Sequence, residues 1–224
     1  ILIQAGILAS QFPTLADRFQ LVGQMDKLPR AIIGLLGDPI HVERLGGFLS
    51  WRTLNFLPVV VGLWSVLALT GTLAGEARAG SLELVVSTPH ERRSIALQKV
   101  AVHVVGLTIV MIVSALSAWV AGLAFGSLPE DAIGLGDALS HMAWLGLTSL
   151  VAGALAFAFA PFVGRTVAAG IGIAASFGAF LVNGYASVVP AFESLRGLSW
   201  FSWSAGHRPL AGVSDPGSLV PLAL

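Results

Sequence analysis

Four long stretches of the chain carry no charged side chain, and this pattern predicts helices that cross a membrane. They cover residues 53–75, 100–129, 138–164 and 166–192. A membrane-spanning helix needs about 20 predominantly apolar residues to cross roughly 30 Å of hydrocarbon. We therefore predict spans at about 53–74, 100–125, 139–163 and 166–188. Gly164 and Arg165 form the turn of a tight hairpin between the last two spans.

The composition supports this interpretation and excludes several other classes of protein. Hydrophobic residues make up 55% of the chain and charged residues only 11%, whereas a soluble domain carries roughly 25% charged residues. Cysteine is absent, so the chain has no disulfides, no thiolate metal site and no cysteine nucleophile. The net charge is zero and no basic tract is present, so we expect no nucleic-acid partner.

Both ends of the chain are apolar, and each is typical of part of a membrane-spanning helix. Residues 1–10 are typical of the second half of a helix that leaves the membrane, and residues 218–224 of one that enters it. No basic region precedes the first stretch, which disfavours a signal peptide. We expect an all-α, polytopic transmembrane bundle over residues 1–224, with about five spans and the beginning of a sixth, as part of a longer polypeptide.

Three more polar connections, at 11–52, 126–138 and 189–216, separate the spans on one side of the bundle. In the first of them Leu15, Phe19, Val22, Met25 and Leu28 recur at helical spacing. This spacing predicts a short amphipathic helix that lies on the membrane surface or caps the bundle. The distribution of Lys and Arg does not decide which side faces the cytoplasm, because both sides carry several.

The remaining connection, residues 75–99, is the most charge-dense part of the chain, with the sequence GEARAGSLELVVSTPHERRSIALQK. Leu82 and Leu84 flank Glu83 in a short amphipathic helix. Thr88 and Glu91 are spaced as a capping box that begins the next helix. Arg92 and Arg93 in its first turn oppose the helix dipole, which indicates that they bind lipid phosphates or an acidic partner surface.

This connection resembles the first cytoplasmic loop of the ABC-2 family of exporter permeases. The extended connection over residues 13–52, with LPRAIIGLLG and GGFLSWR, resembles that of the antibiotic-exporter branch. His90 departs from the family pattern, in which a small apolar residue usually follows the proline. The residues that match the family pattern are Glu76, Arg78, Gly80, Ser81, Leu82, Glu83, Leu84, Ser87, Pro89, Arg93 and Lys99.

The resemblance implies a permease that an ATPase drives from outside the chain. No G-x4-G-K-[ST] motif occurs in the sequence, so ATP and Mg would bind to a partner ABC ATPase subunit, and the chain itself would hold no cofactor and no catalytic site. The loop would lie in the cytoplasm and dock on that ATPase. The implied coupling residues are Glu76, Arg78, Gly80, Leu82, Glu83, Leu84, Pro89, Arg92 and Arg93.

The family also implies a setting and a cargo. The permease would lie in the plasma (inner) membrane of a bacterium and work with a second permease bundle, fused or separate. It would move a hydrophobic or amphipathic small molecule, such as a drug or antibiotic, out of the cell by alternating access. The alternative for the loop is a plain connector that binds anionic membrane lipid.

In the family the second and fifth spans line the route of the substrate. Asn55 and Asn183 are polar groups at membrane depth, where an unpaired polar group is costly. The implied lining of the route is Asn55, Val59, Phe177, Phe180 and Asn183. The alternative for the two asparagines is a hydrogen bond between packed spans.

Two further patterns have plain structural interpretations. Gly170, Ala174 and Gly178 recur every four residues, which predicts a face that packs closely against another helix. His103 and His141 lie near opposite ends of different spans without a carboxylate at ligand spacing. We interpret both as interfacial histidines.

Two other functions stay open beside export. A transporter driven by a proton or sodium gradient would be expected to carry acidic residues inside its spans, and none of the predicted spans contains one. A non-transporting or lipid-handling subunit of a membrane assembly would need no such residues. The sequence does not distinguish it from an exporter.

Overall fold

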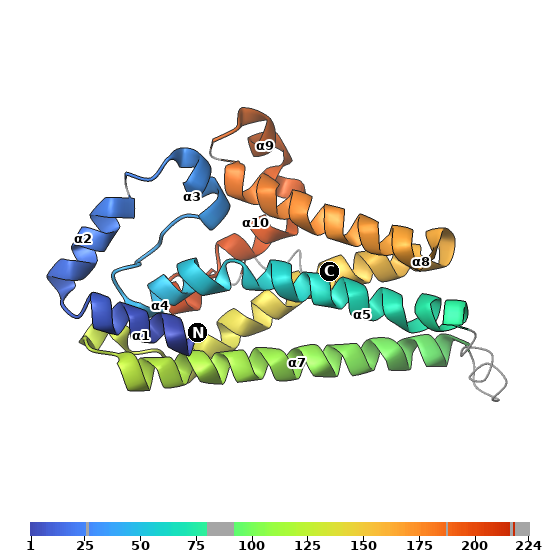
Figure 1. Ribbon diagram of the computed structural model, residues 1–224, viewed down its shortest axis with the longest axis horizontal. Helices are drawn as coiled ribbons and strands as arrows, with labels where there is room; N and C mark the ends of the chain where they lie inside the picture. The colour runs from blue at the N-terminus through green and yellow to red at the C-terminus, as the bar shows by residue number, and fades with distance from the viewer. Residues whose placement is uncertain (26, 80–91, 187, 216, 218–224) are drawn as a thin grey trace.

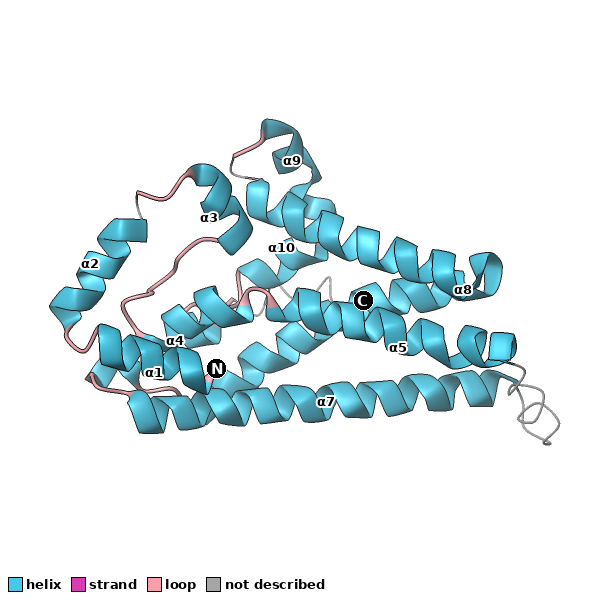
Figure 2. Cartoon of the chain, in the orientation of Figure 1, coloured by secondary structure: helices cyan, strands magenta, loops and turns pink. Residues whose placement is uncertain are grey.

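The computed structural model describes residues 1–25, 27–79, 92–186, 188–215 and 217. The described residues fold almost entirely into helices (Figure 2). Apart from the helices, they form one isolated antiparallel bridge, between Arg208 and Val213. The predicted all-α class is therefore confirmed.

Three long helices lie along the length of the molecule (Figure 1). They are α5 (Leu57–Ala79), α7 (Arg92–Phe125) and α8 (Leu135–Tyr185). By length and hydropathy, two helices in the described chain can cross a membrane, and the number is three if Leu45–Leu54 and Leu57–Thr72 form one span bent by 40°. The chain thus has the character of a membrane protein, while the number of spans stays a prediction.

The helix α8 is broken at Gly164, where the sequence predicts a hairpin. Gly164 has φ 76° and ψ 168°, a conformation that is essentially restricted to glycine. A Cβ atom added at Gly172, in the second half, would lie 2.7 Å from the Cβ of Ala156 in the first half. The two halves therefore fold back on each other, as the sequence predicts.

The small residues that pack between these halves are not the predicted ones. Gly170, Ala174 and Gly178 are exposed, and no atom lies within 4 Å of a Cβ added at either glycine. Gly172 and Ser176 are buried instead. Because successive residues turn about 100° around a helix, a stripe shifted by two residues faces nearly the opposite side. The predicted packing face is wrong in this structure.

The shorter helices gather at one end of the molecule, away from the C-terminus of α5 and the N-terminus of α7 (Figure 1). The sequence predicts most of these segments as loops, apart from α1, where it predicts the end of a spanning helix, and the amphipathic helix that appears as α2. Their bounds are α1 Leu2–Gln11, α2 Leu15–Met25, α3 Arg30–Leu36, α4 Leu45–Leu49, a π-helical turn Ser50–Leu54, 3-10 turns Pro129–Asp131, Arg196–Leu198 and Pro209–Ala211, α9 Pro190–Leu195 and α10 Trp200–Ala205.

The helix α2 begins at a capping box. The Thr14 amide donates to Asp17 Oδ2 over 3.1 Å, and the Asp17 amide donates to Thr14 Oγ1 over 3.2 Å. The reciprocal bonds satisfy two amides that have no partner within the helix. This start places Arg18 on the side of α2 that faces the bundle.

Arg18 and Asp131 form a buried ion pair that the sequence does not predict. Both residues are 0% exposed. Arg18 Nη2 donates to Asp131 Oδ2 over 2.9 Å, and Arg18 Nε donates to the Phe12 carbonyl over 3.0 Å. Asp131 also accepts the amides of Leu45, over 2.9 Å, and Ser127, over 3.0 Å. The pair therefore joins α2, α4 and the turn after α7.

The environment of Asp131 favours its ionised form. Burial by itself raises the pKa of this carboxyl, but hydrogen bonds from Arg18 and from the amides of Leu45 and Leu128 outweigh burial, so the net pKa lies below the usual 3.8. Asp131 therefore stabilises the fold at pH values above that ordinary value. This stabilisation is lost as the pH falls through the lowered pKa of the folded state.

The two histidines of the spans are buried inside the protein, and their predicted depth at the membrane interface stays a prediction. His103 is 7% exposed and His141 is 4% exposed. His103 Nε2 lies 3.0 Å from Ser65 Oγ, and its ring lies 4.7 Å from the ring of Trp64. His103 thus joins α7 to α5, whereas His141 faces a cavity.

Candidate functional site

Two adjoining cavities lie at the end of the bundle where the short helices gather. The small cavity has a volume of ≈ 40 Å³, enough for a few water molecules. The large cavity has a volume of ≈ 310 Å³, at the lower end of the range for small-molecule sites. Asn183, Ala205 and Arg208 line both cavities, so the two lie side by side and share a wall.

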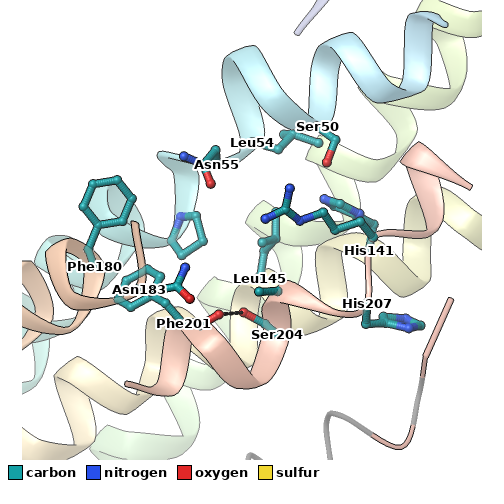
Figure 3. A pocket seen from close by; sticks show the side chains of 13 residues that line it. Ser50, Leu54, Asn55, His141, Leu145, Phe180, Asn183, Phe201, Ser204 and His207 are labelled. Carbon is teal, nitrogen blue, oxygen red and sulfur yellow. Dashed lines mark hydrogen bonds between the residues drawn. The ribbon is translucent and has the colours of Figure 1, made fainter. Parts of the chain in front are cut away.

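Four segments that are far apart in the sequence surround the small cavity (Figure 3). They are the π-helical turn with the start of α5, the first half of α8, the end of α8, and α10 with the residues after it. The lining residues are Ser50, Leu54, Asn55, Pro58, His141, Leu145, Phe180, Asn183, Phe201, Ser204, Ala205, His207 and Arg208.

The aromatic segment that contains α10 is held against the end of α8. Ser199 Oγ donates to the Ala179 carbonyl over 2.7 Å. The Phe201 ring meets the Phe180 ring edge-on, with 5.6 Å between centroids and 72° between planes, a favourable geometry for aromatic pairs. This packing makes the α10 segment one wall of the cavity.

The opposite wall is held by the chain that follows α3. Asn55 Nδ2 donates to the Leu36 carbonyl over 2.8 Å, and Trp51 Nε1 donates to the Gly37 carbonyl over 2.9 Å. Gly37 has φ 79°, a left-handed value that favours glycine at this turn. The side-chain amide of Asn55 thus uses one of its N–H donors to position this wall.

Three buried polar atoms next to the cavities have no hydrogen-bond partner among the residues that the structure describes. They are Nδ1 of His141, Oδ1 of Asn183 and Nδ1 of His207. An unpaired buried polar atom costs about 1–3 kcal/mol. A polar ligand in the cavities would supply the partner that the described residues do not.

The large cavity is also charged. Arg196, Arg208 and Asp38 line it, and Arg208 Nη1 donates to the Asp38 carbonyl over 3.1 Å. Burial lowers the pKa of Arg208; the Asp38 carboxylate opposes this shift, while Arg196 adds to it. Two guanidinium groups and one carboxylate give the cavity a positive formal charge.

The structure brings most of the predicted route residues to this site. Asn55, Phe180 and Asn183 line the small cavity. Val59 is 6% exposed and packs with Phe180 behind its wall. Phe177 is 49% exposed and lies on the outside of the bundle, 6.4 Å from Phe180 between ring centroids. That these residues contact a substrate stays a prediction.

Sequence reasoning missed four residues of the site, Asp38, His141, Arg196 and Arg208. Three of them, Asp38, Arg196 and Arg208, lie in the connections 11–52 and 189–216, where charged residues are ordinary. The one available signal is the pair Arg196 and Arg208 on either side of an aromatic segment. No spacing rule places Asp38 beside that segment, so the sequence does not reveal the site.

The predicted coupling residues lie at the other end of the molecule or outside the described residues. Gly80, Leu82, Glu83, Leu84 and Pro89 are not described. Only the backbone is described for the remaining four, of which Glu76 and Arg78 belong to the last turns of α5 and Arg92 and Arg93 to the first turn of α7.

Within the described ranges, no three His, Cys, Asp or Glu side chains gather as they would around a metal ion. Comparison of the chain with protein-family models, with curated proteins and with solved structures gave no match.

The burial of His207 leads us to expect that the stability of the protein depends on pH. It is 6% exposed and its Nε2 lies 3.0 Å from Ser140 Oγ. Burial lowers its pKa below 6.5, against an opposing effect of Asp215. Below about pH 6.5 the unfolded chain therefore takes up a proton that the folded protein does not. We expect thermal stability in detergent to be constant from pH 8 to 7 and to fall from pH 6.5 to 5.

The variant His207→Gln isolates this effect, because every other titratable group is retained. We expect its melting temperature to depend less on pH over the same range than that of the unaltered protein. Equal pH dependence in the two proteins would show that His207 does not titrate with unfolding.

Proposed function

We propose that this chain is the permease part of an ATP-driven exporter of the ABC-2 type. It moves a hydrophobic or amphipathic small molecule out of the cell, and ATP is hydrolysed on a partner nucleotide-binding subunit. Residues 75–99 dock on that subunit from the cytoplasm, and the end of the bundle that holds the two cavities faces outward.

The observation that carries this proposal is the residue pattern of 75–99 between two long apolar helices. A connector without a partner needs no Gly-Ser-Leu-Glu-Leu stretch followed by a capping box and two arginines. The helices α5 and α7 that this segment joins meet it at the end of the molecule farthest from α3 and α9 (Figure 1). The described ends of this docking segment lie at one end of the bundle, and the polar, aromatic site lies at the other. This arrangement fits a permease in which movement of the ATPase opens the site toward the outside.

The site itself supports an amphipathic cargo. Phe180 and Phe201 present apolar surface to the small cavity, and Arg208 lies across both cavities. Ligand sites are mostly apolar with a few placed polar groups.

Copurification tests the proposal. We expect the tagged full-length protein to bring a P-loop ATPase with it from its native membrane. Leu82→Asp or Glu83→Arg should weaken that association at least about tenfold, because truncating a central contact of an interface costs about 2 kcal/mol or more. Energy-dependent efflux of an amphipathic dye from cells should fall in parallel.

The matched control is Glu193→Arg, which reverses the same charge on α9, at the opposite end of the molecule. It should leave the association and the efflux unchanged. Recovery of no ATPase, together with unchanged efflux in both loop variants, would contradict export and favour the lipid-handling or assembly subunit.

A further inference from the structure

We infer that the large cavity binds the oxyanion of a small molecule, a carboxylate or a phosphate, between Arg196 and Arg208. The cavity is ≈ 310 Å³ in volume and is lined by both arginines together with Asn183, Ser202 and Asp38. These residues come from three regions of the chain that only the fold brings together.

The two arginines have hydrogen-bond donors to spare. A guanidinium carries five N–H donors in a planar fork that matches the two oxygens of a carboxylate or phosphate. In the described chain, Arg208 donates one of its five, to the Asp38 carbonyl. Arg196 is exposed and donates its side-chain N–H groups to no acceptor among the described residues. An oxyanion would use donors that are otherwise directed at solvent.

The electrostatics of the cavity also favour an anion. Arg196 and Arg208 line one space and repel each other, which is one cause of the lowered pKa of Arg208. Asp38 offsets only part of this repulsion, because it is one carboxylate against two cations. An anion between the arginines would offset their repulsion and would shift the pKa of Arg208 back toward its ordinary value.

A second, independent observation points to a ligand at the same place. The Oδ1 atom of Asn183 is buried and has no hydrogen-bond partner in the described part of the chain, and Asn183 lines both cavities. Ser202 Oγ donates within its own turn, to the carbonyls of Arg196 and Ser199, over 2.7 Å each, and so presents its lone pairs rather than its proton to the cavity. The donors that face the cavity are thus the arginines, while Asn183 offers an acceptor for a hydroxyl or amine on the same ligand.

The binding site is independent of any ATPase, so it can be tested on the purified full-length protein in a neutral detergent. Isothermal titration would measure the affinity for inorganic phosphate and for benzoate. A second arm would place the protein in nanodiscs that contain phosphatidylglycerol and in nanodiscs of phosphatidylcholine alone. It would compare how strongly the lipid binds to the protein in the two. Saturation by the soluble anions identifies a free molecule as the ligand, and preference for phosphatidylglycerol alone identifies a lipid headgroup; either result supports an oxyanion site.

The variants give effects of opposite sign. Arg196→Gln should weaken binding about tenfold, because a hydrogen bond to a charged group is lost. Since Arg196 is exposed, this variant should fold normally, which a melting curve would confirm, while Arg208→Gln repeats the test at a partly buried position. Asp38→Asn should strengthen binding about threefold to fivefold, because an opposing charge is removed.

The matched control is Arg52→Gln, which removes an exposed arginine at the same end of the bundle without touching either cavity. It should bind the anion as the unaltered protein does. The site would be overturned if Arg52→Gln and Arg196→Gln lost the same affinity for the anion, or if Asp38→Asn bound the anion more weakly. It would also be overturned if no tested anion bound.

Discussion

Replacing Asp131 with alanine is expected to lower the free energy of unfolding by about 3–5 kcal/mol, because it leaves the buried charge of Arg18 without its partner. Both side chains are fully buried. The substitution also strands the amides of Leu45 and Ser127, which donate to the carboxylate. Unfolding in mixed detergent micelles would measure the loss.

The reverse variant, Arg18→Ala, should be similarly destabilised, because the Asp131 carboxylate is then buried without a cation. Arg18→Met together with Asp131→Leu should recover part of the loss, since an apolar pair avoids an unpaired charge. Recovery should be incomplete because the amides of Leu45 and Ser127 stay unpaired.

An exposed ion pair at the same end of the molecule provides the control. Arg44 Nε lies 4.0 Å from Glu43 Oε1, and the Arg44 side chain is 47% exposed. Arg44→Ala should cost less than about 1 kcal/mol, as is usual for exposed pairs. If Asp131→Ala costs no more than this control, the buried pair does not stabilise the fold.

Gly184→Ala is expected to destabilise the protein by about 1–3 kcal/mol, because it overpacks a place where two backbones touch. A Cβ atom at Gly184 would overlap the carbonyl oxygen of Gly34. Relief of this overlap requires α3 to move away from the end of α8. Gly184 lines the large cavity, so we also expect weaker binding of any ligand held there.

The control is Gly178→Ala, six residues earlier in the same helix, where no atom lies within 4 Å of the added Cβ. Alanine is favoured over glycine inside a helix by about 1 kcal/mol, so this variant should be neutral or slightly more stable. Thermal unfolding of both variants in one detergent would compare them. Equal stability of Gly184→Ala and Gly178→Ala would show that α3 adjusts without cost.

The secondary structure followed from local patterns wherever the pattern was long. The charge-free runs predict α5 and both halves of α8 to within about five residues, because long apolar helices need no information from elsewhere in the chain. They also predict the end of α7 at Phe125, but not its start at Arg92, which lies ahead of the charge-free run 100–129. The amphipathic spacing of Leu15 to Leu28 predicts α2, which ends at Met25, and Gly164 marks the hairpin because its backbone conformation excludes other residues. The connections were predicted less well, since α4, α9 and α10 have five or six residues each and form only where they can pack.

The side on which a helix packs was harder to predict than the helix itself. Two stripes of small residues run along the second half of α8, and the sequence favours the one with more glycine. The structure buries the stripe of Gly172 and Ser176, because the first half of α8 and Val66 of α5 meet it there. Only the position of the neighbouring helices decides between two such stripes.

By itself the sequence determined that this chain is helical, apolar enough for a membrane, and turned back at Gly164. It also carries the resemblance on which the proposed coupling role of residues 75–99 depends. Only the tertiary structure decided that Arg18 pairs with Asp131 and that Asp38, Asn183, Arg196 and Arg208 share one cavity. Helix formation and hydropathy depend on neighbours along the chain, whereas an ion pair or a cavity depends on which distant segments meet.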